Sequence, residues 1–96
     1  MPHDETPISD HRRRRILFRA THRGTQENDI LIGGFVRARL AGFSDPELGA
    51  VEAIIDMPDA ALADWLTGRQ PIPADCDSAM LRAMRQAAED GEGQKR

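Results

Sequence analysis

Residue types that commonly carry chemistry are scarce in this sequence, which has one cysteine, three histidines and no tyrosine among 96 residues. The single cysteine, Cys76, cannot form a disulfide within the chain. Its neighbours Asp75 and Asp77 disfavour the thiolate, because negative charge nearby raises the pKa of a thiol. We therefore expect neither a disulfide framework nor a reactive thiol.

Motifs of the common enzyme classes are also missing. There is no phosphate-binding loop, dinucleotide fingerprint or HExxH pattern, and no nucleophile is paired with a nearby base. His11 and His22 would lie about 16 Å apart on one helix, too far apart to share a metal ion. We expect no catalytic residue, no metal site and no enzymatic activity.

Long apolar runs are absent too, since none approaches the roughly 18 residues that span a membrane. The arginines near the N-terminus are not followed by the apolar segment of a secretory signal. Asp4, Glu5 and Asp10 argue against a mitochondrial presequence, because such peptides are poor in acidic residues. We expect a cytoplasmic protein that does not insert into membranes.

Charge is distributed unevenly along the chain, although the net charge is only −3. Eight arginines lie in residues 12–39, whereas residues 45–64 hold six acidic residues and no lysine or arginine. A row of arginines could contact phosphates, which makes a small nucleic-acid-binding protein the alternative function. Overall acidity and the lack of a recognition helix argue against it. The four arginines that would share one helix face are Arg12, Arg15, Arg19 and Arg23.

Apolar residues at three- and four-residue spacing predict helices throughout and no strand. We expect a compact all-α bundle of five helices over residues 9–90, with short disordered tails at 1–8 and 91–96. Prolines, glycines and capping residues mark the helix ends. The expected helices run from Ser9 or Asp10 to His22, from Glu27 to Ala41, from the Ser44–Glu47 capping box to Pro58, from Pro58 or Asp59 to Gly68, and onward from Asp75 or Asp77.

The apolar stripes of these helices predict the core. Trp65 is expected in the core because Leu62 and Leu66 share its helix face. Gly33 and Gly34 weaken the second helix by up to about 1 kcal/mol each, but they would let another helix or a partner approach closely. The other expected core residues are Ile16, Leu17, Ala20, Thr21, Ile32, Phe35, Val36, Leu40, Phe43, Leu48, Val51, Ile54, Ile55, Met80, Leu81, Met84 and Ala87 or Ala88.

The segment Arg23–Asp29 joins the first two expected helices and has three notable features. Gly24 can adopt a positive φ at little cost and leaves its backbone bare. Arg23 and Glu27 could pair across the turn or with a partner. Glu27 and Asp29 fall in the first turn of the second helix, where the helix dipole favours carboxylates. These residues alone fit an ordinary helix junction better than a binding site, because such features are common at helix ends.

The order of features around this junction resembles one family. Arg23-Gly24-x-x-Glu27-x-Asp29 is similar to the RGxxExD signature of the small succinate dehydrogenase assembly factors, also called flavinylation factors. The resemblance continues from Ile16-Leu17-Phe18-Arg19 to Phe35, and through Pro58-Asp59 to Asp64-Trp65-Leu66-Thr67-Gly68. It covers roughly residues 12–88. His22 and Thr25 depart from the usual pattern, which has arginine and methionine there.

The resemblance implies a five-helix bundle with a chaperone-like function. Such a protein binds the flavoprotein subunit of succinate dehydrogenase, and in some bacteria that of fumarate reductase, and promotes covalent attachment of FAD to a histidine of that subunit. It implies that the flavin stays with the client, so we expect no stably bound cofactor here, and a monomer. Without a phosphate-holding loop, binding of free FAD is disfavoured. The partner-binding residues it implies are Arg19, His22, Arg23, Gly24, Glu27 and Asp29.

Overall fold

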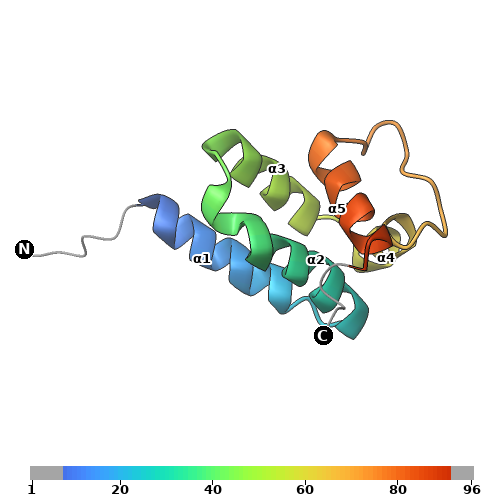
Figure 1. The fold of residues 1–96 in the computed structure, drawn as a ribbon, viewed down its shortest axis with the longest axis horizontal. Helices are drawn as coiled ribbons and strands as arrows, with labels where there is room; N and C mark the ends of the chain where they lie inside the picture. Colours follow the sequence, from blue (N-terminus) through green and yellow to red (C-terminus); the bar gives the residue numbers. More distant parts are fainter. Residues whose placement is uncertain (1–7, 92–96) are drawn as a thin grey trace, which may run out of the picture.

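The computed structural model describes residues 8–91, and within that range it contains helices and no strand. This confirms the all-α prediction (Figure 1). Of the tails expected at residues 1–8 and 91–96, residues 1–7 and 92–96 lie outside the described residues, whereas Ile8 is the first residue of the first helix. The elements are α1 (Ile8–Thr21), α2 (Gln26–Arg39), the 3-10 turn η1 (Leu40–Gly42), α3 (Asp45–Ile55), α4 (Asp59–Leu66) and α5 (Ala79–Glu89).

Local capping chemistry explains most helix ends. The capping box predicted for α3 is present, with Glu47 N–H donating to the Ser44 hydroxyl at 3.3 Å and Ser44 N–H to the Glu47 carboxylate at 2.8 Å. Thr25 caps α2 by accepting from Asn28 N–H. Gly68, just beyond α4, has a φ of +80°, as a helix-ending glycine requires.

Two predicted helix starts are wrong. α5 is capped by Ser78 rather than by Asp75 or Asp77, because backbone hydrogen bonds from Cys76 to Pro73 and from Asp77 to Ala74 hold the preceding residues in a turn. Ser78 has the extended backbone of an N-cap residue, and its hydroxyl accepts from Leu81 N–H. α1 begins at Ile8, so the expected caps Ser9 and Asp10 lie inside its first turn.

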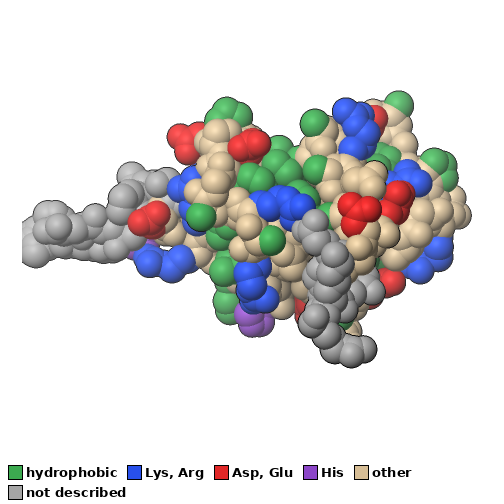
Figure 2. Space-filling view, viewed as in Figure 1, with side chains coloured by type: hydrophobic (Ala, Val, Ile, Leu, Met, Phe, Trp, Pro, Cys, Tyr) green, Lys and Arg blue, Asp and Glu red, His purple; other side chains and the backbone are tan. Residues whose placement is uncertain are grey.

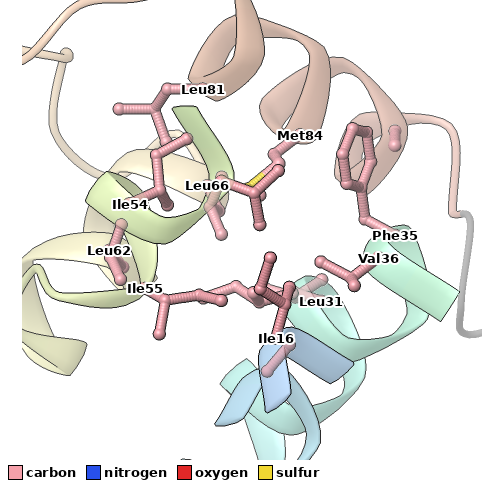
Figure 3. Close-up of a cluster of buried hydrophobic side chains, with 14 of the residues drawn as sticks. Ile16, Leu31, Phe35, Val36, Ile54, Ile55, Leu62, Leu66, Leu81 and Met84 are labelled. Carbon is pink, nitrogen blue, oxygen red and sulfur yellow. The ribbon is translucent and has the colours of Figure 1, made fainter. Parts of the chain in front are cut away.

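All five α-helices contribute to one core, drawn in Figure 3. Trp65 is 9% exposed, which confirms its expected place there. Leu17, Thr21, Leu40 and Met80 were also expected in the core but are only partly buried. The buried hydrophobic residues are Ile16, Ala20, Leu31, Ile32, Phe35, Val36, Phe43, Leu48, Val51, Ile54, Ile55, Leu62, Trp65, Leu66, Leu81, Met84 and Ala87.

α1 packs closely against α2 at Gly33, which agrees with the expectation that a glycine in this helix lets another helix approach. A Cβ built on Gly33 would lie 2.9 Å from the Thr21 Cγ2 atom and 3.1 Å from the Ala20 carbonyl oxygen. The end of α1 is therefore held against α2 by a contact that leaves no room for a side chain. This contact fixes where the α1–α2 turn stands in the molecule.

Gly33→Ala is expected to lower the free energy of unfolding by about 1 kcal/mol, because overpacking outweighs the better helix propensity of alanine. Gly49→Ala in α3 is the matched control. Its Cβ would meet only the Arg12 Nη2 atom at 3.6 Å, an ordinary contact, so stability should rise by about 0.5–1 kcal/mol. Urea unfolding followed by circular dichroism measures both changes. Equal stabilisation by the two alanines would show that α1 and α2 do not touch at Gly33.

Candidate functional site

The turn between α1 and α2 presents bare backbone to solvent. Gly24 has a φ of +97° and is exposed, and a Cβ built on it would have no atom within 4 Å. Glu27 and Asp29 lie in the first turn of α2, as predicted, beside the positive end of the helix dipole. Gly24 therefore occupies an open corner that a second molecule could approach closely.

The side chain of Arg23 points into the molecule and is only 7% exposed. Its Nη1 donates to the Ile55 carbonyl at 2.6 Å and its Nη2 to the Met57 carbonyl at 2.9 Å. Its Nε donates to the Asp59 carboxylate at 2.6 Å. The guanidinium thus satisfies the carbonyl of the last residue of α3 and one carbonyl of the α3–α4 link, and it forms an ion pair with the first residue of α4.

Asn28 and Asp29 complete a polar cluster with Arg23 and Asp59, which we call the buried junction. Asp29 accepts from the backbone N–H of Arg23 at 2.7 Å. Asn28 is 1% exposed, and its Nδ2 donates to the Asp59 carbonyl at 2.9 Å and to its carboxylate at 3.0 Å. If the Asn28 amide were turned round, its oxygen would face the Asp59 carbonyl and carboxylate oxygens, which cannot donate a hydrogen bond. These contacts therefore determine which end of the amide is the nitrogen. The junction ties the Gly24 corner to α3 and α4.

The electrostatics of the junction favour an ionised Asp59. The hydrogen bond from Arg23 is the main cause that lowers the pKa of Asp59, and the Asn28 hydrogen bond adds to it, while burial opposes both. A carboxyl whose pKa is lower in the folded protein stabilises the fold above its unfolded pKa of about 3.9. That contribution is lost as the pH falls through the lowered value.

Glu27 lies on the surface and does not pair with Arg23. Its carboxylate is 3.6 Å from the Arg69 guanidinium, and both side chains are about half exposed. Arg69 also donates to Asp64 at 3.0 Å. An exposed pair of this kind contributes little to stability. The Glu27 carboxylate is therefore accessible from solvent beside Gly24.

The last turns of α1 carry an exposed aromatic residue, Phe18, that is not among the site residues predicted from the sequence. Phe18 is 62% exposed, and its ring stacks on that of His22 with centroids 4.0 Å apart and an interplanar angle of 12°. Arg19, on the same turn, pairs with the exposed Asp56. Phe18 does not lie on the apolar stripe of α1 that buries Ile16 and Ala20. Its position in the sequence could therefore have indicated an exposed aromatic side chain.

The arginine row of α1 is paired along much of its length with acids of residues 45–64. Arg12 makes two hydrogen bonds to Glu52, at 3.1 and 2.8 Å, and they are the main cause that lowers the pKa of Glu52. Arg19 pairs with Asp56 and Arg23 with Asp59. The basic and acidic segments therefore pack together and partly neutralise each other. Such a row is a poor phosphate-binding surface, and nothing supports the nucleic-acid alternative.

Cys76 has the environment expected of an unreactive thiol. It is half-buried, and burial is the main cause that raises its pKa, with Asp75 adding to the effect. Within residues 8–91 no group of histidines, cysteines and acids is placed to hold a metal ion. No helix of the described part is long and apolar enough to cross a bilayer.

Comparison with known proteins gives a consistent set of relatives. Residues 14–88 match the family described as "flavinator of succinate dehydrogenase". Over 73 residues the chain is 55% identical to the FAD assembly factor SdhE of Acetobacter pasteurianus, which covers 76% of this chain and 67% of that protein.

Mitochondrial proteins are similar at lower identity. The succinate dehydrogenase assembly factor 2 of Mycosarcoma maydis is 37% identical over 60 residues, covering 62% of this chain and 25% of that protein. Its counterpart in Debaryomyces hansenii is 31% identical over 87 residues, covering 86% of this chain and 61% of that protein. The chain thus spans less than two thirds of each of these two relatives.

Proposed function

Because this chain belongs to the family described as flavinators of succinate dehydrogenase, we propose that it is a chaperone-like assembly factor. It would bind the flavoprotein subunit of succinate dehydrogenase and promote the covalent attachment of FAD to that subunit. The similarity to a bacterial FAD assembly factor over 76% of the chain supports this role. The flavoprotein of fumarate reductase is proposed as a second client.

One structural observation carries the proposal for the site. The Gly24 backbone is exposed and unobstructed, and the buried junction holds it in place from behind. Gly24 and Glu27 would contact the client, together with Arg19 and His22 on α1. Arg23 and Asp29 would act from inside by positioning the corner, since Arg23 is 7% exposed and Asp29 holds its backbone N–H.

We assign the chemistry of flavin attachment to the client and its flavin. The pKa of the Cys76 thiol is raised, and the Thr21 hydroxyl beside His22 donates to the Leu17 carbonyl at 2.8 Å, so neither group is an activated nucleophile. The chain would act by binding most tightly to the client conformation that is competent for attachment, which increases the population of that conformation. It would bind no cofactor stably and would act as a monomer in the cytoplasm.

The experiment is a measurement of covalent flavin in a strain that lacks this chain. Covalently attached flavin survives denaturation, so in-gel fluorescence of the denatured flavoprotein subunit reports attachment directly. We expect a strong band with the chain restored and a large loss without it. Equal fluorescence in the two strains would contradict the proposed function.

A further inference from the structure

We propose that the exposed end of α1, formed by Arg15, Phe18, Arg19 and His22, docks an acidic segment of the flavoprotein that places an apolar side chain against Phe18. We call these four residues the α1 docking face. The proposal rests on the proposed function, because it takes the flavoprotein as the partner. It adds Arg15 and Phe18 to the contacts proposed for Arg19 and His22, and it specifies the chemistry of the partner segment.

Phe18 has the properties of a binding anchor. It is the only large hydrophobic side chain that is exposed among the described residues, at 62%. His22 covers one face of its ring by stacking, and the His22 Nδ1 atom lies 2.8 Å from the Phe18 carbonyl oxygen and 3.0 Å from the Thr21 hydroxyl. Both rings are therefore ordered before binding, which reduces the entropy that a partner contact would cost.

A hollow beside this pair offers space for a side chain. It has a volume of about 250 Å³ and lies between the end of α1 and the α3–α4 junction. Ile55 contributes apolar surface to its lining, and Arg23 and Asp59, which also line it, already bond to each other. An apolar side chain can enter without breaking a buried polar contact, since the junction keeps its partners. The hollow is lined by Phe18, Arg19, His22, Arg23, Ile55 and Asp59.

Charge complementarity favours an acidic partner. Arg15 and Arg19 are exposed on the same side of α1, and Figure 2 shows cationic, hydrophobic and histidine side chains next to one another along the lower edge of the molecule. Both side chains of the Arg19–Asp56 pair are exposed, Arg19 at 43% and Asp56 at 67%. Because such pairs contribute little to stability, a partner carboxylate can replace Asp56 at small cost.

Continuity with the Gly24 corner identifies the flavoprotein as the occupant. His22 lies two residues before Gly24, so a partner that approaches the bare backbone of the corner also covers the α1 docking face. A second hollow, of about 440 Å³, lies between α2, α3 and α5 and includes Ala83. Figure 2 shows hydrophobic side chains between α3 and α5 there, and that hollow supplies a control surface.

The test is the Kd of the purified flavoprotein subunit for this chain and its variants. Phe18→Ala should weaken binding by about tenfold or more, as truncation of an aromatic anchor does. Arg19→Ala should weaken binding and reduce its salt dependence. The controls are Arg82→Ala, which removes another exposed arginine paired with a carboxylate, and Ala83→Gln in the second hollow. Both should bind like the wild type.

Each other outcome has a distinct meaning. If Phe18→Ala binds normally while Ala83→Gln binds weakly, the partner docks on the second hollow. That result would contradict the assignment of the α1 docking face as the binding surface. If wild type does not bind the flavoprotein at all, the proposed function fails, and this inference fails with it. Phe18-dependent binding to duplex DNA or single-stranded RNA, without Phe18-dependent binding to the flavoprotein, would make the face a nucleic-acid surface and overturn the proposal.

Discussion

Asp59→Ala should lower the free energy of unfolding by about 3 kcal/mol, because it leaves a buried guanidinium without its counter-ion. Arg23 is 7% exposed, so water cannot replace the lost carboxylate fully. Asn28 loses one of its two acceptors in the same change. A domain of this size has a small total stability, so the melting temperature should fall by more than about 10 °C. Urea and thermal unfolding followed by circular dichroism measure the loss.

Two controls separate burial from charge in this experiment. Asp56→Ala removes the partner of Arg19, but both side chains are exposed, so stability should change by less than about 1 kcal/mol. Asp59→Asn keeps an acceptor for Arg23 and should lose less than alanine. If Asp59→Ala were no worse than Asp56→Ala, the buried junction would not hold the corner.

The acid dependence gives an independent check of the same carboxylate. Because the pKa of Asp59 is lowered in the folded protein, its stabilising effect is complete above about pH 4 and fades as the pH falls further. The difference in stability between wild type and Asp59→Asn should therefore be largest at neutral pH and shrink below about pH 4. A difference that does not change with pH would contradict the ionised pair.

Gly24→Arg should remove most of the covalent flavin from the client while leaving the helices intact. The φ of +97° strains any residue with a Cβ, at a cost of about 1–2 kcal/mol, but a Cβ there meets no atom of this chain within 4 Å. The long side chain would instead occupy the space through which a partner approaches the backbone. Circular dichroism and in-gel fluorescence of the client report the two effects separately.

Gly91→Arg is the matched control for this substitution. Gly91 also has a positive φ, +78°, and a Cβ there would likewise have no atom within 4 Å. Its variant carries a similar backbone strain beyond the C-terminus of α5, so stability should fall by a comparable amount while flavin attachment stays normal. Normal attachment with Gly24→Arg, or an equal loss with Gly91→Arg, would show that the corner is not the functional surface.

Features that depend on neighbours in sequence were predictable. The Ser44–Glu47 capping box, the stop at Gly68 and the core position of Trp65 follow from local hydrogen bonds and helical periodicity. The N-cap of α5 could not be predicted, because Asp75, Asp77 and Ser78 are all residue types that can cap a helix. Only the turn that follows Pro73 selects the serine.

The direction of Arg23 could not be predicted because its partners are far away in the sequence. Asp59, Ile55 and Met57 lie 32 to 36 residues further along the chain, and only the packed helices bring them to the guanidinium. Phe18 differs, since its place off the buried stripe was visible in the sequence. The motif Arg23-Gly24-x-x-Glu27 therefore contains two kinds of residue, with Arg23 turned inward and Gly24 and Glu27 turned outward.

The central claim is that this chain promotes flavin attachment to another protein through its Gly24 corner. The most direct measurement mixes purified flavoprotein subunit and FAD with wild-type chain, with Gly24→Arg or with no chain, and follows in-gel fluorescence of the denatured subunit over time. We predict rapid appearance of covalent flavin with wild type, and slow appearance, at equal rates, in the other two mixtures. Equal rates in all three mixtures would contradict the claim.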